Sequence, residues 1–175
     1  MPRTAPEVKK AAVRRYGAAI VECEPTQEAK EQNSNEAGRL VQETGGTFIH
    51  PSNNANVIAG QGTIAVEFIA QTEEQGVSLD GLVLPVGGGG MLSGCTVFAA
   101  EPELVNEAFR FYSTKTRQCN PSGKTSVADG LTGNISELAF ELVMTNVDGI
   151  FTVTETQIVE GYGFGVDTNE AMHLT

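Results

Sequence analysis

The segment Leu79–Gly94, LDGLVLPVGGGGMLSG, constrains the fold more than any other part of the chain. Its apolar run Leu82–Val86 predicts a short strand that is buried on both faces. Four consecutive glycines, Gly87–Gly90, follow at once. Without Cβ atoms the backbone can adopt positive φ and approach a ligand, so that successive N–H groups converge on phosphate oxygens. The segment therefore predicts an anion-binding turn. The alternative is a flexible linker, which rarely sits directly behind a buried strand.

The charge and composition of the chain argue against several classes of function. A formal net charge of -11 over 175 residues gives a nucleic-acid-binding role no electrostatic support. No apolar run approaches the roughly 20 residues that a membrane-spanning helix needs. The three cysteines, Cys23, Cys95 and Cys119, lack metal-ligand spacing, and their odd number argues against a disulfide framework. We therefore expect a cytoplasmic protein with neither nucleic acid nor membrane among its partners.

The order of apolar patterns before the glycines predicts an open α/β layer followed by a lobe boundary. The patterns alternate between helix and strand, with helices over 8–16 and 28–43 and strands over 18–23 and 47–50. The turn-forming segment Pro51–Asn56 then marks the boundary, and a longer helix over 57–71 follows. Because glycine is costly inside a helix, Gly60 and Gly62 indicate close packing near a ligand or another backbone.

The connection that follows the glycines is unusually short. Only residues 87–96 separate the first strand from a second one over 97–100. A parallel crossover usually needs about a dozen or more residues, most of them in a helix. The crossover is therefore cramped, or the two strands do not both belong to a regular parallel sheet. Further on, the patterns predict helices over 103–112 and 135–144, a strand over 149–153, and a helix that begins at Thr154 and stops at Gly161.

Several segments together carry a resemblance to a known family. They are KKAAVRRYGA, IVECEPT, FIHPSNNANVIAGQGTIAVE, LDGLVLPVGGGGMLSG, AAEPE, VADGL and GIFTVTETQIVEG. From about Pro6 to Gly161 their order resembles that of serine racemases and the related serine/threonine dehydratases, fold-type II enzymes that use pyridoxal 5′-phosphate (PLP). The resemblance implies an open, doubly wound sheet, a partial form of the tryptophan synthase β-like architecture. It divides the chain into three parts. Residues 1–54 form a partial small lobe, residues 55–161 a partial large lobe that binds the cofactor phosphate, and residues 162–175 a divergent tail.

The resemblance implies a phosphate site and a cation site. The phosphate site is the glycine loop with the residue behind it, Gly87, Gly88, Gly89, Gly90 and Met91. The cation site would bind Mg²⁺ or Ca²⁺ through two carboxylates and two backbone carbonyls, those of Glu101, Glu107, Val105 and Gly130. Glu107 stands where aspartate is usual, and a longer carboxylate can still bind such a cation. The alternative is that both glutamates form a solvated helix face.

The resemblance also implies a nucleotide site and a substrate contact, with fewer matching residues. Lys9 and Tyr16 match the site at which ATP acts as an effector of the racemases. The alternative is a surface charge at Lys9 and a Tyr16 side chain that packs on its own helix. Lys30 matches an arginine that approaches the substrate carboxylate, and this replacement is not conservative. Ser52 stands where an asparagine near the cofactor is usual.

The chemistry of the family requires a lysine that forms a Schiff base with the cofactor, in an SFKxRGA motif. Neither this motif nor the SSGNHG segment of the family occurs in the sequence, so no catalytic residue is assigned. We therefore expect a truncated and catalytically incomplete relative of serine racemases (isomerases) and L-serine or L-threonine dehydratases (lyases), with a small amino acid as the family's substrate. The alternatives are a non-catalytic phosphate-binding or regulatory protein, which pairs with itself or with a full-length homologue, and a truncated product without an independent function.

Overall fold

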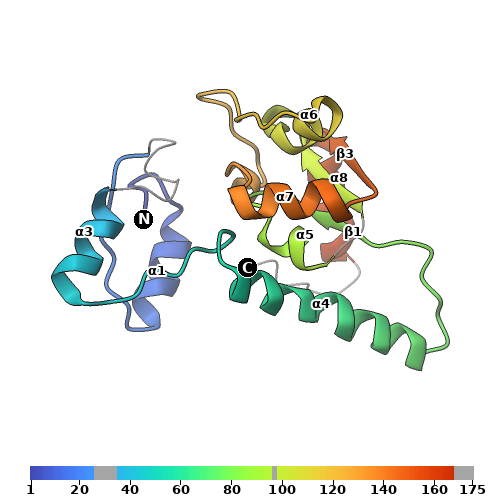
Figure 1. Ribbon diagram of the computed structural model, residues 1–175, viewed down its shortest axis with the longest axis horizontal. Coiled ribbons are helices and arrows are strands. Elements are labelled where there is room, and N and C mark those ends of the chain that lie inside the picture. The colour runs from blue at the N-terminus through green and yellow to red at the C-terminus, as the bar shows by residue number, and fades with distance from the viewer. Residues whose placement is uncertain (26–34, 96–97, 168–175) are drawn as a thin grey trace. The chain divides into compact units, whose positions relative to one another are not determined.

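The computed structural model of the chain describes residues 1–25, 35–95 and 98–167. These residues belong to two compact units, Met1–His50 and Pro51–Thr175, which we call unit 1 and unit 2. Figure 1 labels most of the helices and strands of the two units. Each unit is built around its own helices, and unit 2 alone contains a sheet among the described residues.

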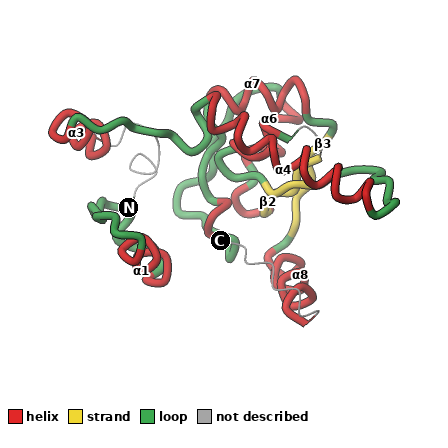
Figure 2. The backbone as a smooth tube through the Cα atoms, turned by 90° about the horizontal axis from the view of Figure 1, so that it is seen from below, coloured by secondary structure: helices red, strands yellow, loops and turns green. Residues whose placement is uncertain are grey.

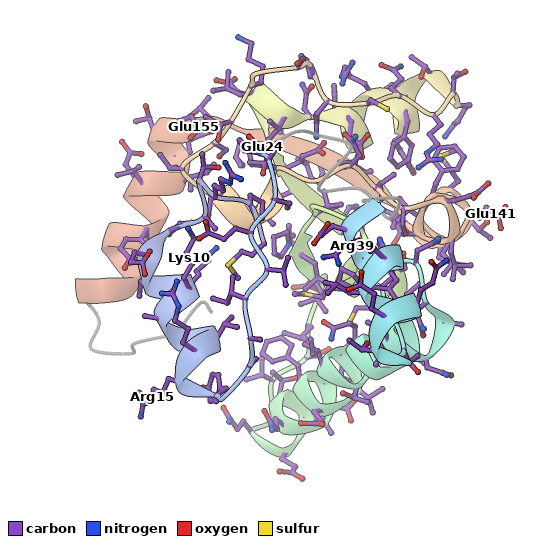
Figure 3. All side chains as sticks on the ribbon, turned by 90° about the vertical axis from the view of Figure 1, so that its left-hand side faces the viewer. Lys10, Arg15, Glu24, Arg39, Glu141 and Glu155 are labelled. Atoms are coloured by element: carbon purple, nitrogen blue, oxygen red, sulfur yellow. The ribbon has the colours of Figure 1, made fainter. Side chains whose placement is uncertain are left out.

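Unit 1 contains the helices α1 (Glu7–Arg15) and α3 (Asn35–Thr44). α1 ends as predicted before Gly17, whose φ of 78° lies in the left-handed region that glycine favours. The buried Lys10 of α1 donates from Nζ to the Arg3 carbonyl oxygen and to Glu22 Oε1, both at 2.8 Å (Figure 3). The first part of the predicted helix over 28–43, up to residue 34, lies outside the described residues.

The two strands predicted for unit 1, over 18–23 and 47–50, are wrong. Within the described residues of this unit, the one β-type pairing is an isolated bridge between Pro2 and Cys23. A strand is stable only when a neighbouring strand pairs with its N–H and C=O groups. Residues 18–23 pair with a neighbour only at this one bridge, and residues 47–50 have no paired strand among the described residues, so both segments stay irregular. Cys23 is half-buried.

A three-stranded parallel sheet forms the centre of unit 2 (Figure 2). Its order is β1 (Val83–Pro85), β2 (Phe98–Pro102) and β3 (Gly149–Val153), with Val83 opposite Phe98 and Phe98 opposite Gly149. The first two strands thus both belong to a regular parallel sheet. Of the two alternatives that the sequence left open, the structure therefore has the short, cramped crossover. Its helix α5 (Gly90–Gly94) has only 5 residues.

The first strand is not buried on both faces as the sequence predicts. Leu84 is buried, whereas Val83 is 57% exposed and Pro85 is exposed as well. Successive side chains of a strand point to opposite faces of the sheet. The face of β1 that carries Val83 and Pro85 is therefore open, and β1 is also an edge strand of the described sheet.

Unit 2 also contains four longer helices among the described residues. They are α4 (Ala55–Glu74), α6 (Glu107–Thr114), α7 (Glu137–Asn146) and α8 (Glu155–Asp167), with the short 3-10 helices η1 (Glu103–Val105) and η2 (Asp129–Leu131). α4 packs against α5, α5 against α7, and α6 against β3. The core of unit 2 includes Leu84, Val86, Leu92, Ala99, Phe111, Ile135, Ala139, Val143 and Ile150. In the described ranges, none of the helices has the length and hydropathy of a membrane span.

Two helices of unit 2 differ from their predictions. α8 does not stop at Gly161 but continues through Gly163 and Gly165 to Asp167, although each glycine costs about 1 kcal/mol inside a helix relative to alanine. Its start is as predicted, since the Gln157 N–H donates to Thr154 Oγ1 at 3.2 Å. The segment predicted as one helix over 103–112 divides into η1 and α6, and it buries Phe111, whereas Phe109 is 38% exposed.

Candidate functional site

The glycine loop, residues Gly87–Gly90, joins β1 to α5. Gly89 has a φ of 83°, in the left-handed region where a side chain is strained. A Cβ atom at this position would also lie 2.5 Å from Ile135 Cγ1 and 2.8 Å from Ala139 Cβ. The predicted positive φ is therefore confirmed at Gly89, and two independent constraints require glycine there.

Neighbouring segments hold the other glycines of the loop closely. A Cβ at Gly88 would lie 2.9 Å from Ser52 Oγ, and one at Gly90 would lie 2.8 Å from the Pro51 carbonyl oxygen. A Cβ at Gly87 would lie 3.1 Å from the Gly130 carbonyl oxygen. A loop packed in this way is not a flexible linker, and the alternative interpretation of the sequence is wrong.

Backbone N–H groups gather where the loop enters α5. The Ser93 N–H donates to the Gly89 carbonyl oxygen at 2.9 Å, which makes this the first hydrogen bond of the helix. The N–H groups that precede Ser93 in this turn have no acceptor inside the helix. N–H groups of this kind, next to a left-handed glycine, are the type of donor that can bind a phosphate group. Met91, behind the loop, packs against the core.

Hydrogen bonds connect the loop to α7 and to the segment that precedes α4. The Ser136 N–H donates to the Gly88 carbonyl oxygen at 3.2 Å, and Ser136 Oγ donates to the Ser52 carbonyl oxygen at 2.8 Å. The Leu138 N–H donates to Asn53 Oδ1 at 3.1 Å. The structure thus brings Ser52, one of the predicted substrate residues, next to the glycine loop, where its side chain is buried.

Sequence reasoning missed the other two polar residues of this arrangement. Ser136 directly precedes an apolar helical pattern, and a serine at that place is a recognisable N-cap signal. Asn53 gave no comparable signal for α7, because the helix that it caps begins far along the chain. A residue that caps a distant helix leaves no local pattern in the sequence.

Two buried carboxyl groups lie near each other at the end of β2 and the start of α6. Glu101 Oε1 accepts from the Ala108 N–H at 3.2 Å, and Oε2 accepts from the Phe109 N–H at 3.0 Å. Burial nevertheless raises the pKa of Glu101 to about 7. Burial, and after it the nearby charge of Glu101, raise the pKa of Glu107 to about 8. The Ile135 N–H, which donates to Glu107 Oε1, lowers this pKa and offsets part of the rise. Each residue is only 1% exposed, so the alternative of a solvated helix face is wrong.

The glutamate pair has one feature of a cation site. Glu107 Oε2 is buried and has no hydrogen-bond partner among the described residues. A buried carboxylate oxygen without a partner fits a hard cation such as Mg²⁺ or Ca²⁺. No group of three or more acidic, histidine or cysteine side chains is arranged for a metal in the parts that the structure describes. The resemblance also predicts two backbone carbonyl ligands. Val105 lies between the two glutamates in the sequence and is fully buried. The carbonyl of Gly130 instead lies against Gly87 of the glycine loop.

The remaining predicted residues are Lys9, Tyr16 and Lys30, which lie in the sequence range of unit 1. Lys9 is an exposed residue of α1, and Tyr16, at the end of this helix, is 87% exposed. The alternative in which the Tyr16 side chain packs on its own helix is therefore wrong, and the nucleotide site stays a prediction. Lys30 lies outside the described residues.

Comparison with protein families and curated proteins gives concordant matches. The family described as pyridoxal-phosphate dependent enzyme matches residues 1–164. The chain is 41% identical over 171 residues to beta-hydroxyaspartate dehydratase of Paracoccus denitrificans, a match that covers 91% of this chain and 52% of that protein. It is 40% identical over 169 residues to serine racemase of Homo sapiens, a match that covers 90% of this chain and 48% of that protein. The chain spans about half the length of the curated relatives it matches.

Solved structures of related enzymes have the same fold. Maize serine racemase matches with a TM-score of 0.85 and 29% identity, over 95% of this chain and 51% of that chain. The serine racemase of Dictyostelium discoideum matches with a TM-score of 0.77 and 33% identity, over 95% of this chain and 54% of that chain. The predicted α/β fold of fold-type II enzymes is thus confirmed. Family match, sequence identity and fold agree, and the chain belongs to the pyridoxal-phosphate-dependent enzymes.

Proposed function

We propose that this chain binds PLP through the cofactor phosphate at the glycine loop, as part of a serine racemase-like or dehydratase-like protein. The observation that carries the proposal is the packed loop with its left-handed Gly89 at the entrance to α5. When bound, PLP supplies an electron sink for bonds broken at the Cα of an amino acid. Small hydroxy amino acids, L-serine and L-threonine, are the proposed substrate class of the complete reaction.

The proposed work of this chain's own residues is binding and orientation. The N–H groups of Gly88, Gly89 and Gly90 would hold the phosphate, and the buried Ser52 would border it. No residue is assigned to move the proton at the substrate Cα, since the lysine motif of the family does not occur in the sequence. We therefore propose that this chain, on its own, binds the cofactor but does not complete the reaction.

We also propose that Glu101 and Glu107, with the Val105 carbonyl, hold a divalent cation. The support is the unpartnered Glu107 Oε2 and the burial that disfavours two charged carboxylates at this place. A cation would neutralise the pair and stabilise unit 2, because it joins the end of β2 to the start of α6. Gly130 remains a predicted ligand only.

Titration of the purified chain with PLP, followed by its visible absorption, tests the cofactor proposal. We expect saturable binding that inorganic phosphate competes away, with no lysine adduct in the mass spectrum after borohydride treatment. Incubation with L-serine or L-threonine should yield no pyruvate or 2-oxobutanoate. Absence of saturable binding would refute the phosphate site, and robust formation of either keto acid would refute the proposal that the chain is catalytically incomplete.

A second candidate is a non-catalytic partner of a full-length relative. It is favoured by the exposure of apolar side chains, since Val66 of α4 is 70% exposed and Val83 of β1 is 57% exposed. In this case the chain should comigrate with a full-length serine racemase in gel filtration and change its turnover. If the two proteins elute separately and turnover is unchanged, this candidate is excluded.

A further inference from the structure

Two polar residues outside the glycine loop, Asn53 and Ser136, cap the start of α7 together. The Leu138 N–H donates to Asn53 Oδ1 at 3.1 Å, and the Ala139 N–H donates to Ser136 Oγ at 3.3 Å. Helix capping explains these two bonds, because the first N–H groups of a helix lack partners within it. It does not explain the other contacts of Ser136.

Ser136 makes two further hydrogen bonds that a helix cap does not need. Its N–H donates to the Gly88 carbonyl oxygen at 3.2 Å, and its Oγ donates to the Ser52 carbonyl oxygen at 2.8 Å. Ser136 and Ser52 are each only 5% exposed. Inside a protein such bonds are stronger than in water, and a partner that is lost leaves a costly buried carbonyl.

The bond to Gly88 determines how the next N–H group points. The Gly88 carbonyl and the Gly89 N–H belong to one planar trans peptide, so they point in opposite directions. When Ser136 holds the carbonyl on its own side, the Gly89 N–H must point away from Ser136. The left-handed φ of 83° at Gly89 then continues the turn into α5.

We propose that Asn53 and Ser136 are positioning residues of the phosphate site, which act by holding the Gly88–Gly89 peptide in its donor orientation. Ser136 fixes the peptide directly, and Asn53 fixes the N-terminus of α7 on which Ser136 stands. This inference rests on the proposed binding of PLP at the glycine loop. It extends that site to two side chains that do not touch the ligand.

Affinity and stability measured on the same variants separate positioning from simple support of the fold. The test variants are Asn53→Ala and Ser136→Ala, and the matched control is Val143→Ala, which removes buried apolar contacts from the core face of α7. All three should lower the melting temperature. Only the first two should weaken binding of PLP and of inorganic phosphate, by about tenfold each, the effect of losing one buried hydrogen bond.

Conservative replacements provide the rescue. Asn53→Asp keeps an acceptor, and a negative charge is favourable at a helix N-terminus. Ser136→Thr keeps the hydroxyl group. Both variants should bind PLP within about threefold of the unaltered chain, a change smaller than one hydrogen bond gives. Tenfold losses in these variants as well would overturn the proposal.

A measurement on the unaltered chain covers the case in which the alanine variants do not fold. Hydrogen exchange of the Gly89 amide, followed by NMR, should slow when PLP or inorganic phosphate is added. If the exchange rate of the Gly89 amide is unchanged at saturating ligand, the assigned orientation is overturned. Equal affinities for PLP in the unaltered, Asn53→Ala and Ser136→Ala chains would overturn it as well. If the unaltered chain binds neither probe, the proposed function fails, and this inference fails with it.

Discussion

At position 89 the residue type is determined by the backbone and by the neighbours independently. The φ of 83° strains any side chain, and a Cβ would lie 2.5 Å from Ile135 Cγ1. At Gly161, inside α8, neither constraint exists, because φ is not positive and no atom lies within 4 Å of a Cβ. Gly89 and Gly161 are both glycines in glycine-rich segments of the sequence, yet of the two positions the structure requires glycine only at position 89.

Alanine substitutions should separate the two glycines. Gly89→Ala should lower the free energy of unfolding by about 2–4 kcal/mol, the sum of left-handed strain and overpacking. It should also abolish PLP binding. Gly161→Ala, the control, should raise the free energy of unfolding by up to about 1 kcal/mol, since alanine is the better helix former. Urea unfolding measures both, and a Gly89→Ala chain as stable as the unaltered one would contradict the loop geometry.

Among the secondary-structure elements, the short helix α5 depends most on its neighbour. A helix of 5 residues is not stable in isolation. It is held by direct backbone contact with α4, where a Cβ at Gly94 would lie 2.6 Å from the Gly62 nitrogen. Cys95 Sγ also donates to the Gln61 carbonyl oxygen at 3.2 Å. This contact allows the cramped crossover to remain part of a parallel sheet.

The two glycines of α4 should therefore respond differently to substitution. Gly62→Ala should lower the melting temperature and the free energy of unfolding by about 1–3 kcal/mol, because its Cβ would lie 2.8 Å from the Gly94 carbonyl oxygen. Gly60→Ala, two positions earlier, should be neutral or stabilising, since nothing lies within 4 Å there. Calorimetry of both variants checks this contrast, and equal effects would argue against the α4–α5 contact.

What residue patterns alone predicted correctly was local, and what they missed depended on distant neighbours. The helical period over 57–71 and the Thr154 cap are properties of adjacent residues, and the structure confirms them. The sequence indicated close packing at both Gly60 and Gly62, but only a neighbouring backbone could decide between them, and it lies next to Gly62. The roles of Asn53 and Ser136 likewise depend on partners far along the chain.

For the molecule as a whole, the buried glutamates make stability depend on pH. The pKa of Glu101 is about 7 and that of Glu107 about 8, against an ordinary value of 4.5 in the unfolded chain. Between pH 4.5 and about 8, the unfolded chain therefore binds fewer protons than the folded chain. The free energy of unfolding then falls as the pH rises, by up to about 1.4 kcal/mol per pH unit for each group.

Replacement of one glutamate should flatten this dependence. In the presence of a chelator, the unaltered chain should lose stability from pH 5 to pH 8, by roughly 1 kcal/mol or more in urea unfolding. Glu107→Gln should show a smaller slope, because the amide keeps an acceptor for the Ile135 N–H and cannot ionise. Glu141→Gln, on the exposed surface of α7, is the control and should keep the full slope (Figure 3). A slope unaffected by Glu107→Gln would contradict the assignment.

A divalent cation should reverse the loss of stability at high pH. At pH 8, added Mg²⁺ or Ca²⁺ should raise the melting temperature of the unaltered chain by several degrees, as expected for a ligand that binds only the folded state. The same addition should leave the melting temperature of Glu107→Gln nearly unchanged. If both proteins respond equally, the cation binds elsewhere, and if neither responds, the proposed cation site is wrong.

The hydrogen bonds between Ser136 and Ser52, and between Leu138 and Asn53, join positions 84 and 85 residues apart. During synthesis on the ribosome, residues 51–54 and the glycine loop emerge well before α7 does. Chains are made from the N-terminus at a limited rate, about 5–20 residues per second. The proposed phosphate site therefore cannot reach its final shape until residue 139 has left the exit tunnel. If the loop binds PLP as proposed, a ribosomal pause before that point would delay binding of the cofactor.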